Sequence, residues 1–313
     1  MKWLITGGTG FIGSHVALAF VEAGYEVLVL DQSEPKAHLK LKEIAPSFIG
    51  NICDTTTYLE VIENAKIDGI INLAALKSVE ESKKAPELYD DVNHIGTLRL
   101  LETAEKLGIK YFIQSSTAAV YGNNPKGLVS EKDALEPISP YGESKIEAEK
   151  ALNKFIERDV LRGTSLRYFN VAGTVRRSLK DTSQDNLIPK VLLALSKNEA
   201  PIIFGDDYPT KDGTCIRDYV HVEDVARAHL LAAEKLVDKQ IAKAINIGTG
   251  TGYSVKEVIE ALLLDKSSPL VPIIERRREG DPASLTANVD LAKTEISFSA
   301  SKTLQDMVSS SFL

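Results

Sequence analysis

The sequence predicts an α/β fold with a doubly wound parallel sheet and a smaller C-terminal lobe. The first observation is that short runs rich in Ile, Val and Leu alternate with stretches of helical spacing through the first half. The second is a glycine-rich turn, TGGTGFIG, between the first such run and the first helical stretch. Strands that are apolar on both faces are typical of a parallel sheet covered by helices on each side.

Each element is predicted from its own pattern. Strands are expected at the apolar runs 2–7, 26–31, 46–51, 68–75, 109–116 and 164–173. Helices are expected where apolar residues recur every three or four positions, at 11–24, 95–108 and 141–159. The doubly wound sheet is expected to end near residue 172.

Beyond residue 172 the sequence becomes polar and rich in turns, which predicts a separate lobe. We therefore expect a sheet domain of residues 1–172 and a lobe of residues 173–313. Residues 220–236 have helical spacing and residues 244–250 resemble a strand. Segments near 214–248 are therefore expected to return to the sheet domain.

Composition excludes several classes of protein. The net charge of −7 argues against a nucleic-acid binder, and no apolar run approaches the roughly 18 residues of a membrane span. The apolar stretch at the N-terminus is too short for a secretory signal. The two cysteines, Cys53 and Cys215, are far apart, so neither a disulfide framework nor a metal site is expected. A reducing cytoplasm is the expected location.

The glycines of the first turn predict a dinucleotide site. Gly7, Gly10 and Gly13 allow a tight turn and let a pyrophosphate approach the backbone, where the next helix presents free N–H groups. The second strand ends at Asp31, whose carboxylate is suited to the hydroxyls of a ribose and would repel a 2′-phosphate. Gln32 follows instead of an arginine. The pattern therefore favours a Rossmann domain that binds NAD over one that binds NADP.

A second motif, SPYGESK, places Tyr141 and Lys145 on one face of a predicted helix. Such a spacing is common by chance, but beside a dinucleotide it has a use. A neighbouring ammonium and a positive nicotinamide ring would stabilise the phenolate, which could then act as a base. The hydroxyl residues 115–117 end the fifth predicted strand, where a parallel sheet binds its ligand. One of these hydroxyls is expected to share the substrate's hydrogen bond.

These motifs, with AALKSVEES, SSTAAVYG, LRYFNVAG, NLIP, YPTKDGTCIRDYVHVEDVA and RREGD, cover nearly the whole chain. By them the chain resembles the extended short-chain dehydrogenase/reductase family, and within it the UDP-glucose 4-epimerases. The resemblance implies an NAD-dependent enzyme that interconverts UDP-glucose and UDP-galactose through a transient 4-keto sugar. It also implies a homodimer that pairs through helices near residues 94–107 and 142–158.

The resemblance carries roles to individual residues. It implies that Tyr141 is the proton acceptor, Lys145 its electrostatic partner and Thr117 the catalytic hydroxyl. With the glycine motif, the predicted cofactor contacts are Gly7, Gly10, Phe11, Ile12, Gly13, Asp31, Gln32, Asn51, Ile52, Leu73, Ala74, Ala75, Lys77, Asn93, Ser115, Tyr141, Lys145 and Phe169. The predicted substrate contacts are Thr117, Tyr141, Asn170, Asn186, Leu187, Phe204, Arg217, Arg278, Asp281 and Leu285.

The chain departs from the family pattern at a few cofactor positions. Asn51 stands where an aspartate usually faces the adenine amino group, although an amide oxygen can also accept that bond. Asn72 stands where a histidine is common, and the loop after Asp31 is short. These differences bear on how tightly NAD is held and leave the reaction unchanged.

Three rival functions stay open on the residues alone. A nucleotide-sugar 4,6-dehydratase needs an acid–base pair directly after the catalytic hydroxyl, where this chain has Ala118 and Ala119. A UDP-glucuronate epimerase or decarboxylase is separated only by assay. A non-catalytic NAD-binding regulator would have no reason to keep Tyr141, Lys145 and Thr117 together.

Overall fold

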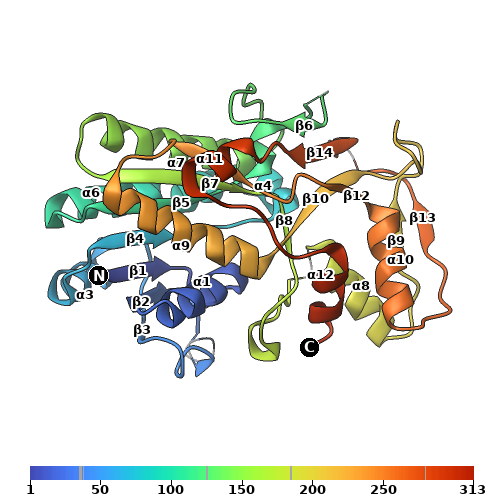
Figure 1. The fold of residues 1–313 in the computed structure, drawn as a ribbon, viewed down its shortest axis with the longest axis horizontal. Coiled ribbons are helices and arrows are strands. Elements are labelled where there is room, and N and C mark those ends of the chain that lie inside the picture. The colour runs from blue at the N-terminus through green and yellow to red at the C-terminus, as the bar shows by residue number, and fades with distance from the viewer. Residues whose placement is uncertain (35–36, 38, 125, 184, 279) are drawn as a thin grey trace.

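The computed structural model describes residues 1–34, 37, 39–124, 126–183, 185–278 and 280–313. Its main sheet has seven strands in the order β11-β7-β5-β4-β1-β2-β3, and every neighbouring pair is parallel (Figure 1). The strands are β1 (Lys2–Thr6), β2 (Glu26–Asp31), β3 (Ser47–Ile49), β4 (Gly69–Asn72), β5 (Tyr111–Thr117), β7 (Arg162–Tyr168) and β11 (Ala244–Ile247). The strand order reverses beside β1, so the ligand crevice of such a sheet is expected there.

Helices cover both faces of this sheet (Figure 1). One face packs against α1 (Phe11–Glu22), α9 (Val222–Asp238) and α11 (Asp290–Ile296). The other packs against α3 (Leu59–Ala65), α6 (Gly96–Leu107) and α7 (Pro140–Glu157). Alternate residues of β1 serve the two faces, since Trp3 and Ile5 lie in the first core and Leu4 in the second.

The smaller part of the molecule lies at the carboxyl end of the main sheet, on the right of Figure 1. Its five-stranded sheet has the order β12-β10-β14-β6, with β8 paired to β10, and a separate pair joins β13 and β9. These strands are β6 (Leu128–Val129), β8 (Asn170–Ala172), β9 (Ile202–Phe204), β10 (Ile216–His221), β12 (Gly252–Ser254), β13 (Ile273–Glu275) and β14 (Ser284–Ala287). Its helices are α8 (Leu187–Ser196), α10 (Val255–Asp265) and α12 (Leu304–Ser311).

A short helical segment joins β4 to α6. It consists of α4 (Val79–Lys84), α5 (Pro86–Tyr89) and a π-helical turn, Asp90–Ile95. Together with α7 it forms one wall of the crevice, so it carries the residues that hold the loop after β4.

The α/β fold and its doubly wound parallel sheet are confirmed, but one predicted strand is wrong. Residues 164–173 do not form a single strand, because the chain changes sheets at Phe169. The N–H of Phe169 makes the last bond to the main sheet, to the carbonyl of Ile247 (3.2 Å), and β8 then pairs with β10. The apolar pattern continues across this change and so conceals it.

The main sheet also extends beyond its predicted end near residue 172. As expected for part of the segment 214–248, β11 joins β7 and α9 packs on the sheet. The earlier part of that segment forms β10, which belongs to the smaller sheet instead. Because β6 of the first half pairs with β14 of the second, the domain boundary at residue 172 stays a prediction. None of the described helices is long and apolar enough to span a bilayer.

Candidate active site

The glycine turn between β1 and α1 brings backbone against backbone. Gly7 has a φ of +67°, which favours glycine. A Cβ on Gly13 would lie 2.3 Å from the carbonyl oxygen of Gly7, so only hydrogen fits there. Gly10 precedes α1 and offers no side-chain cap, which leaves the first N–H groups of the helix open to an anion.

Asp31 lies at the carboxyl end of β2, next to this turn. Its Oδ2 accepts a hydrogen bond from the Thr9 N–H (3.0 Å), and its Oδ1 accepts from the N–H (2.9 Å) and Oγ (2.7 Å) of Ser33. These bonds fix the carboxylate beside the phosphate turn, where a ribose would lie. Residues 35, 36 and 38 of the short loop that follows lie outside the described part of the chain.

Lys145 is held at the end of β5. It stands on α7, which begins behind the N-cap Ser139, whose Oγ accepts from the Gly142 N–H (3.2 Å). The Lys145 ammonium donates to the carbonyl oxygen (3.0 Å) and the Oγ (3.1 Å) of Ser115. Burial lowers the pKa of Lys145 to about 7, and the carboxylate of Glu149 opposes that shift.

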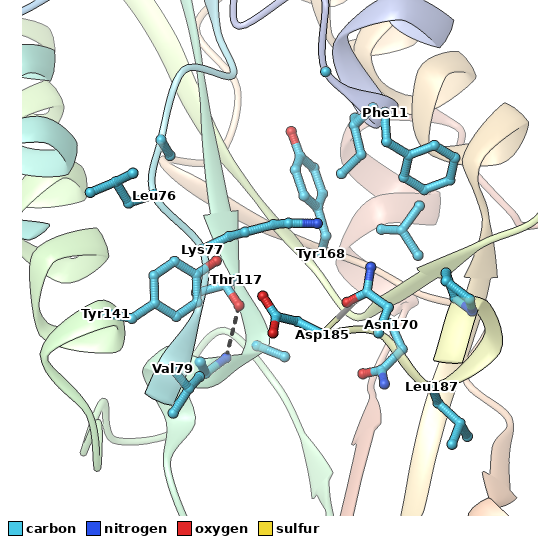
Figure 2. A pocket seen from close by; sticks show the side chains of 18 of the residues that line it. Phe11, Leu76, Lys77, Val79, Thr117, Tyr141, Tyr168, Asn170, Asp185 and Leu187 are labelled. Atoms are coloured by element: carbon cyan, nitrogen blue, oxygen red, sulfur yellow. Dashed lines mark hydrogen bonds between the residues drawn. The ribbon is translucent and has the colours of Figure 1, made fainter. Parts of the chain in front are cut away.

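Tyr141 occupies the same face of α7, one turn before Lys145, and faces Thr117 (Figure 2). Burial raises the pKa of the Tyr141 phenol, and a hydrogen bond with Thr117 lowers it by a smaller amount. The ring of Tyr89 packs edge-on against Tyr141, with ring centroids 6.3 Å apart. The phenol is therefore fixed in position but needs further positive charge to become a base at neutral pH.

The three hydroxyls at the end of β5 have different partners. Ser115 binds Lys145, the Thr117 Oγ accepts from the Ala119 N–H (3.2 Å) and faces Tyr141, and the Ser116 Oγ donates to Glu149 Oε1 (2.5 Å). Glu149 is in turn paired with the buried Arg167, through bonds of 2.9 Å from Nε and 2.6 Å from Nη2. Only Thr117 is thus left to meet a substrate beside Tyr141.

Asn93 holds the loop after β4. Its Oδ1 accepts from the N–H of Leu76 (2.8 Å), while its Nδ2 donates to the carbonyl of Leu76 (3.0 Å) and to Ser144 Oγ (3.0 Å). These bonds tie the loop 73–77 to α7. Asn93 does not line the cavity. Direct contact between Asn93 and the cofactor therefore stays a prediction, and the structure gives it a positioning role.

The chain departs from the family pattern at Asn72 and Asn51, and both side chains have hydrogen-bond partners within the protein. Asn72 is buried at the end of β4, where it bonds Thr6, Thr97 and Gln114. Asn51 lines the cavity, and its Oδ1 accepts from the N–H of Cys53 (2.9 Å). An amide oxygen has a second lone pair, so Asn51 retains a site for an adenine amino group.

The smaller lobe contributes two arginines from separate segments. Arg217, on β10, donates to the carbonyls of Ile216 (2.8 Å) and Pro282 (2.7 Å) and lies 3.5 Å from Asp281. The Arg278 guanidinium stacks over the ring of Phe204 at 4.0 Å and has no carboxylate partner among the described residues. Two such guanidiniums can hold a diphosphate.

The helix α8 adds a third polar feature to this lobe. Its N-cap is Asn186, whose Nδ2 donates to Asp181 (2.6 Å). No described side chain caps the first N–H groups of the helix, which leaves them available to the ligand.

The glycine turn, Asp31, the Tyr141–Thr117–Lys145 group and the two arginines border one cavity of about 1120 Å³. Except for Asn93, every predicted site residue lines it. Sequence reasoning missed Tyr168, Asp185 and Lys190, which also line it. The Tyr168 hydroxyl meets Nε2 of the buried His229 (2.6 Å), and it directly precedes Phe169 in the motif LRYFN. Among the described residues, no group of three or more His, Cys, Asp or Glu side chains could hold a metal ion.

Comparison with known proteins agrees with this geometry. A family model described as the NAD dependent epimerase/dehydratase family matches residues 3–248. The chain belongs to this family. The UDP-glucose 4-epimerase of Halalkalibacterium halodurans is 41% identical over 94% of this chain and 89% of its own length. That of Bacillus subtilis is 37% identical over 100% of this chain and 96% of its own.

Solved structures of similar proteins superpose closely on this chain. The UDP-glucose-4-epimerase of Stenotrophomonas maltophila, with bound NAD and formylated UDP-arabinopyranose, has a TM-score of 0.94 and 34% identity, covering 100% of this chain and 97% of its own. The Bifidobacterium longum enzyme, in complex with NAD+ and UDP, has a TM-score of 0.91 and 33% identity over 99% and 97%. MoeE5, in complex with UDP-glucuronic acid and NAD, has a TM-score of 0.84 and 30% identity over 99% and 97%.

Proposed function

We propose that this protein is an NAD-dependent UDP-glucose 4-epimerase, which interconverts UDP-glucose and UDP-galactose through a transient 4-keto sugar. One observation carries the proposal. A single cavity joins a dinucleotide turn, the Tyr141–Thr117–Lys145 group and a pair of arginines suited to a diphosphate. The relatives named UDP-glucose 4-epimerase support the same reading.

The residues of the first half fit NAD. The contact of Gly13 with Gly7 lets a pyrophosphate approach the backbone, and Asp31 places a carboxylate where a ribose would lie. The chemistry that the cofactor supplies is reversible hydride transfer at C4 of the sugar. Because the hydride is returned in each cycle, no net oxidation occurs and the cofactor has no need to leave.

Tyr141 is proposed to remove the proton of the 4-hydroxyl as the hydride departs. Thr117 faces the same phenol, so it can orient the sugar hydroxyl between them. The ammonium of Lys145, fixed by Ser115, favours the phenolate of Tyr141 from the same helix face. Tyr141 returns the proton when hydride re-enters from the other face of the keto sugar.

The residues of the smaller lobe are proposed to hold UDP in place while the 4-keto sugar rotates in the site. Arg217 and Arg278 bind the diphosphate, and Phe204 borders the uracil. Leu285 lines the cavity and is proposed to form an apolar wall beside the sugar. An apolar side chain makes no hydrogen bond that would fix the orientation of a hexose. A loosely held sugar can present either face to the cofactor.

The direct test is to incubate the purified protein with UDP-galactose and to separate the products by chromatography. We expect UDP-glucose to accumulate to an equilibrium mixture, and denaturation of the protein to release near-stoichiometric NAD with little NADP. Consumption of UDP-galactose without UDP-glucose would contradict the proposal. Release of mainly NADP would contradict the role of Asp31.

The quaternary structure and the cellular location remain predictions. A homodimer would pair through α6 and α7, which match the helices predicted at residues 94–107 and 142–158. Light scattering coupled to gel filtration gives the mass directly, and a monomer at micromolar concentration would contradict the dimer. A cytoplasmic location stays an expectation from the sequence.

A further inference from the structure

Asp185 places a carboxylate in the cavity that the reaction above does not use. It directly precedes Asn186, the N-cap of α8, and its side chain points into the cavity on the side of Thr117 (Figure 2). The N–H of Asp185 donates to Ser183 Oγ (3.2 Å). Asp185 is exposed, and its carboxylate has no hydrogen-bond or ion-pair partner among the residues that the structure describes.

Asp185 lies on the side of the cavity where Thr117 and Tyr141 meet. Burial raises the pKa of Tyr89, its hydrogen bond and charge interaction with Glu81 raise it further, and Asp185 adds to the shift. Figure 2 places the Asp185 carboxylate beside Thr117, so its charge lies next to the proposed position of the reacting sugar.

The opposite charge stands farther along α8. Lys190 also lines the cavity, and its pKa is lowered by burial and by Arg278, with Asp185 opposing the shift. Lys190 and Arg278 are thus two neighbouring cations, which favour an anion between them. The start of α8 therefore presents a negative charge near Tyr141 and a positive charge near the proposed diphosphate site.

This polarity matches a UDP-hexose, whose diphosphate is anionic and whose sugar is neutral. Two lysines also line this part of the cavity. Lys145 is bonded to Ser115, and Lys77 extends toward Tyr168 (Figure 2). A sugar carboxylate beside Thr117 would therefore face the Asp185 carboxylate.

We propose that Asp185 is a specificity residue that excludes nucleotide sugars with a carboxylate in the hexose, such as UDP-glucuronate. The inference rests on the proposed function, because it takes the cavity to bind a UDP-hexose. Two carboxylates that lie close together in a partly solvated cavity repel each other. The neutral hydroxymethyl group of UDP-glucose carries no such cost and can donate a hydrogen bond to Asp185.

Binding is measured by titration calorimetry on the purified holoprotein with UDP-glucose, UDP-glucuronate and UDP. The first two ligands differ only at C6, and UDP lacks the sugar. We expect wild type to prefer UDP-glucose. Asp185→Asn keeps the shape and an acceptor but removes the charge, so it should reduce this preference about 10-fold, the size of one like-charge contact in a partly solvated site. The affinity for UDP should stay within about twofold.

Glu199→Gln is the matched control. Glu199 lines the same cavity beyond the far end of α8, so the same change of charge there should leave the ratio of the two affinities unchanged. Equal affinity of wild type for both sugars would overturn the proposal. An Asp185→Asn protein that keeps the wild-type ratio of these two affinities would also overturn it. So would an Asp185→Asn protein whose affinity for UDP rises by the same factor as its affinity for UDP-glucuronate.

Turnover of UDP-galactose is measured on the same preparations. Failure of wild type to form UDP-glucose sinks the proposed function, whereas the ratio of binding affinities still decides the role of Asp185. The two failures are therefore distinguishable.

Discussion

The cofactor half and the substrate half of the cavity are built in different ways. The cofactor half depends on backbone, as where Gly13 lies against the carbonyl of Gly7, and on side chains fixed by internal bonds, such as Asp31 and Asn93. The substrate half depends on side chains from distant segments. Arg217 comes from β10, Arg278 follows β13, and Asp185 precedes α8.

This difference fits the two ligands. A cofactor that is restored in each cycle can be held tightly by a rigid backbone turn, whereas UDP-sugars must enter and leave. The sugar must also turn between two hydride transfers, which a close-fitting polar pocket would prevent. The comparison therefore predicts that changes in one half spare the ligand of the other, except at residues that serve both.

Tyr141 serves both halves, so its loss should have the largest effect. Tyr141→Phe removes one hydroxyl and leaves the packing against Tyr89 in place. General-base catalysis contributes about 10²–10⁴-fold, so kcat should fall by about that factor. NAD content and the affinity for UDP should stay near wild type. The measurement is steady-state turnover of UDP-galactose, and near-normal turnover would remove Tyr141 from the mechanism.

Gly13→Ala should damage the cofactor half alone. Its Cβ would lie 2.3 Å from the Gly7 oxygen, so the turn must open, and overpacking of this kind costs about 1–3 kcal/mol. We expect NAD affinity to fall up to about 100-fold, as measured by retained cofactor, and UDP affinity to change little. Gly108→Ala is the control for a general loss of stability, since Gly108 has a φ of +67°, open space at its Cβ position and no part in the cavity lining. Full NAD retention in Gly13→Ala would contradict the backbone argument.

The residues of the cofactor half are easier to predict from the sequence than those of the substrate half, because they lie on neighbouring elements of the chain. Gly7 follows β1, Gly13 lies in the first turn of α1 and Asp31 ends β2, so their spacing along consecutive elements indicates the site. Arg217 and Arg278 are joined only by tertiary packing and could be predicted only through resemblance. Lys190 and Asp185 were missed because their spacing fits a surface helix equally well, and the change of sheets at Phe169 leaves the apolar pattern intact.

Arg278→Ala should damage the substrate half alone. A hydrogen bond to a charged group contributes about 1.5–3 kcal/mol, so the Kd for UDP should rise about 10- to 100-fold while NAD content is unchanged. Arg277→Ala is the matched control, because its guanidinium is paired with Asp207 (2.6 Å) and lies over Tyr208. Calorimetry with UDP measures both. Equal losses in the two variants would contradict the specific role of Arg278.

Glu149→Gln tests whether the carboxylate of Glu149 keeps Lys145 protonated beside β5. The carboxylate of Glu149 opposes the burial that lowers the pKa of Lys145 to about 7, so removing it should lower that pKa further. Lys145 is proposed to act when protonated. The alkaline limb of the rate profile should therefore move to lower pH, with about a 10-fold loss of kcat at pH 8.

Glu143→Gln is the control on the same helix, since Glu143 is exposed. Because breaking a buried ion pair is destabilising, retained NAD should be measured to show that Glu149→Gln is folded. Ser116→Ala, which removes only the bond to Glu149, is the milder companion. A profile that falls uniformly without shifting would indicate a purely structural role for Glu149.

The smallest predicted effect concerns Leu285, the apolar wall proposed to lie beside the sugar. Leu285 lies on β14 beside Arg217 of β10 and packs with Phe169 in a buried cluster that borders the cavity. Packed interiors respond to single methylenes, so an acetamido group at C2 of the sugar needs space there. Wild type should prefer UDP-galactose to UDP-N-acetylgalactosamine. Leu285→Cys should shift the ratio of the two kcat/KM values toward the N-acetyl sugar severalfold, and Leu285→Tyr should shift it away.

The ratio is the proper observable, because Leu285→Cys also leaves a cavity in the core and lowers stability for both substrates. Leu128→Cys supplies the control: β6 pairs with β14, but the Leu128 side chain is 51% exposed, so the same substitution there should leave the ratio unchanged. A ratio that does not follow side-chain volume at residue 285 would mean that this wall lies away from the sugar.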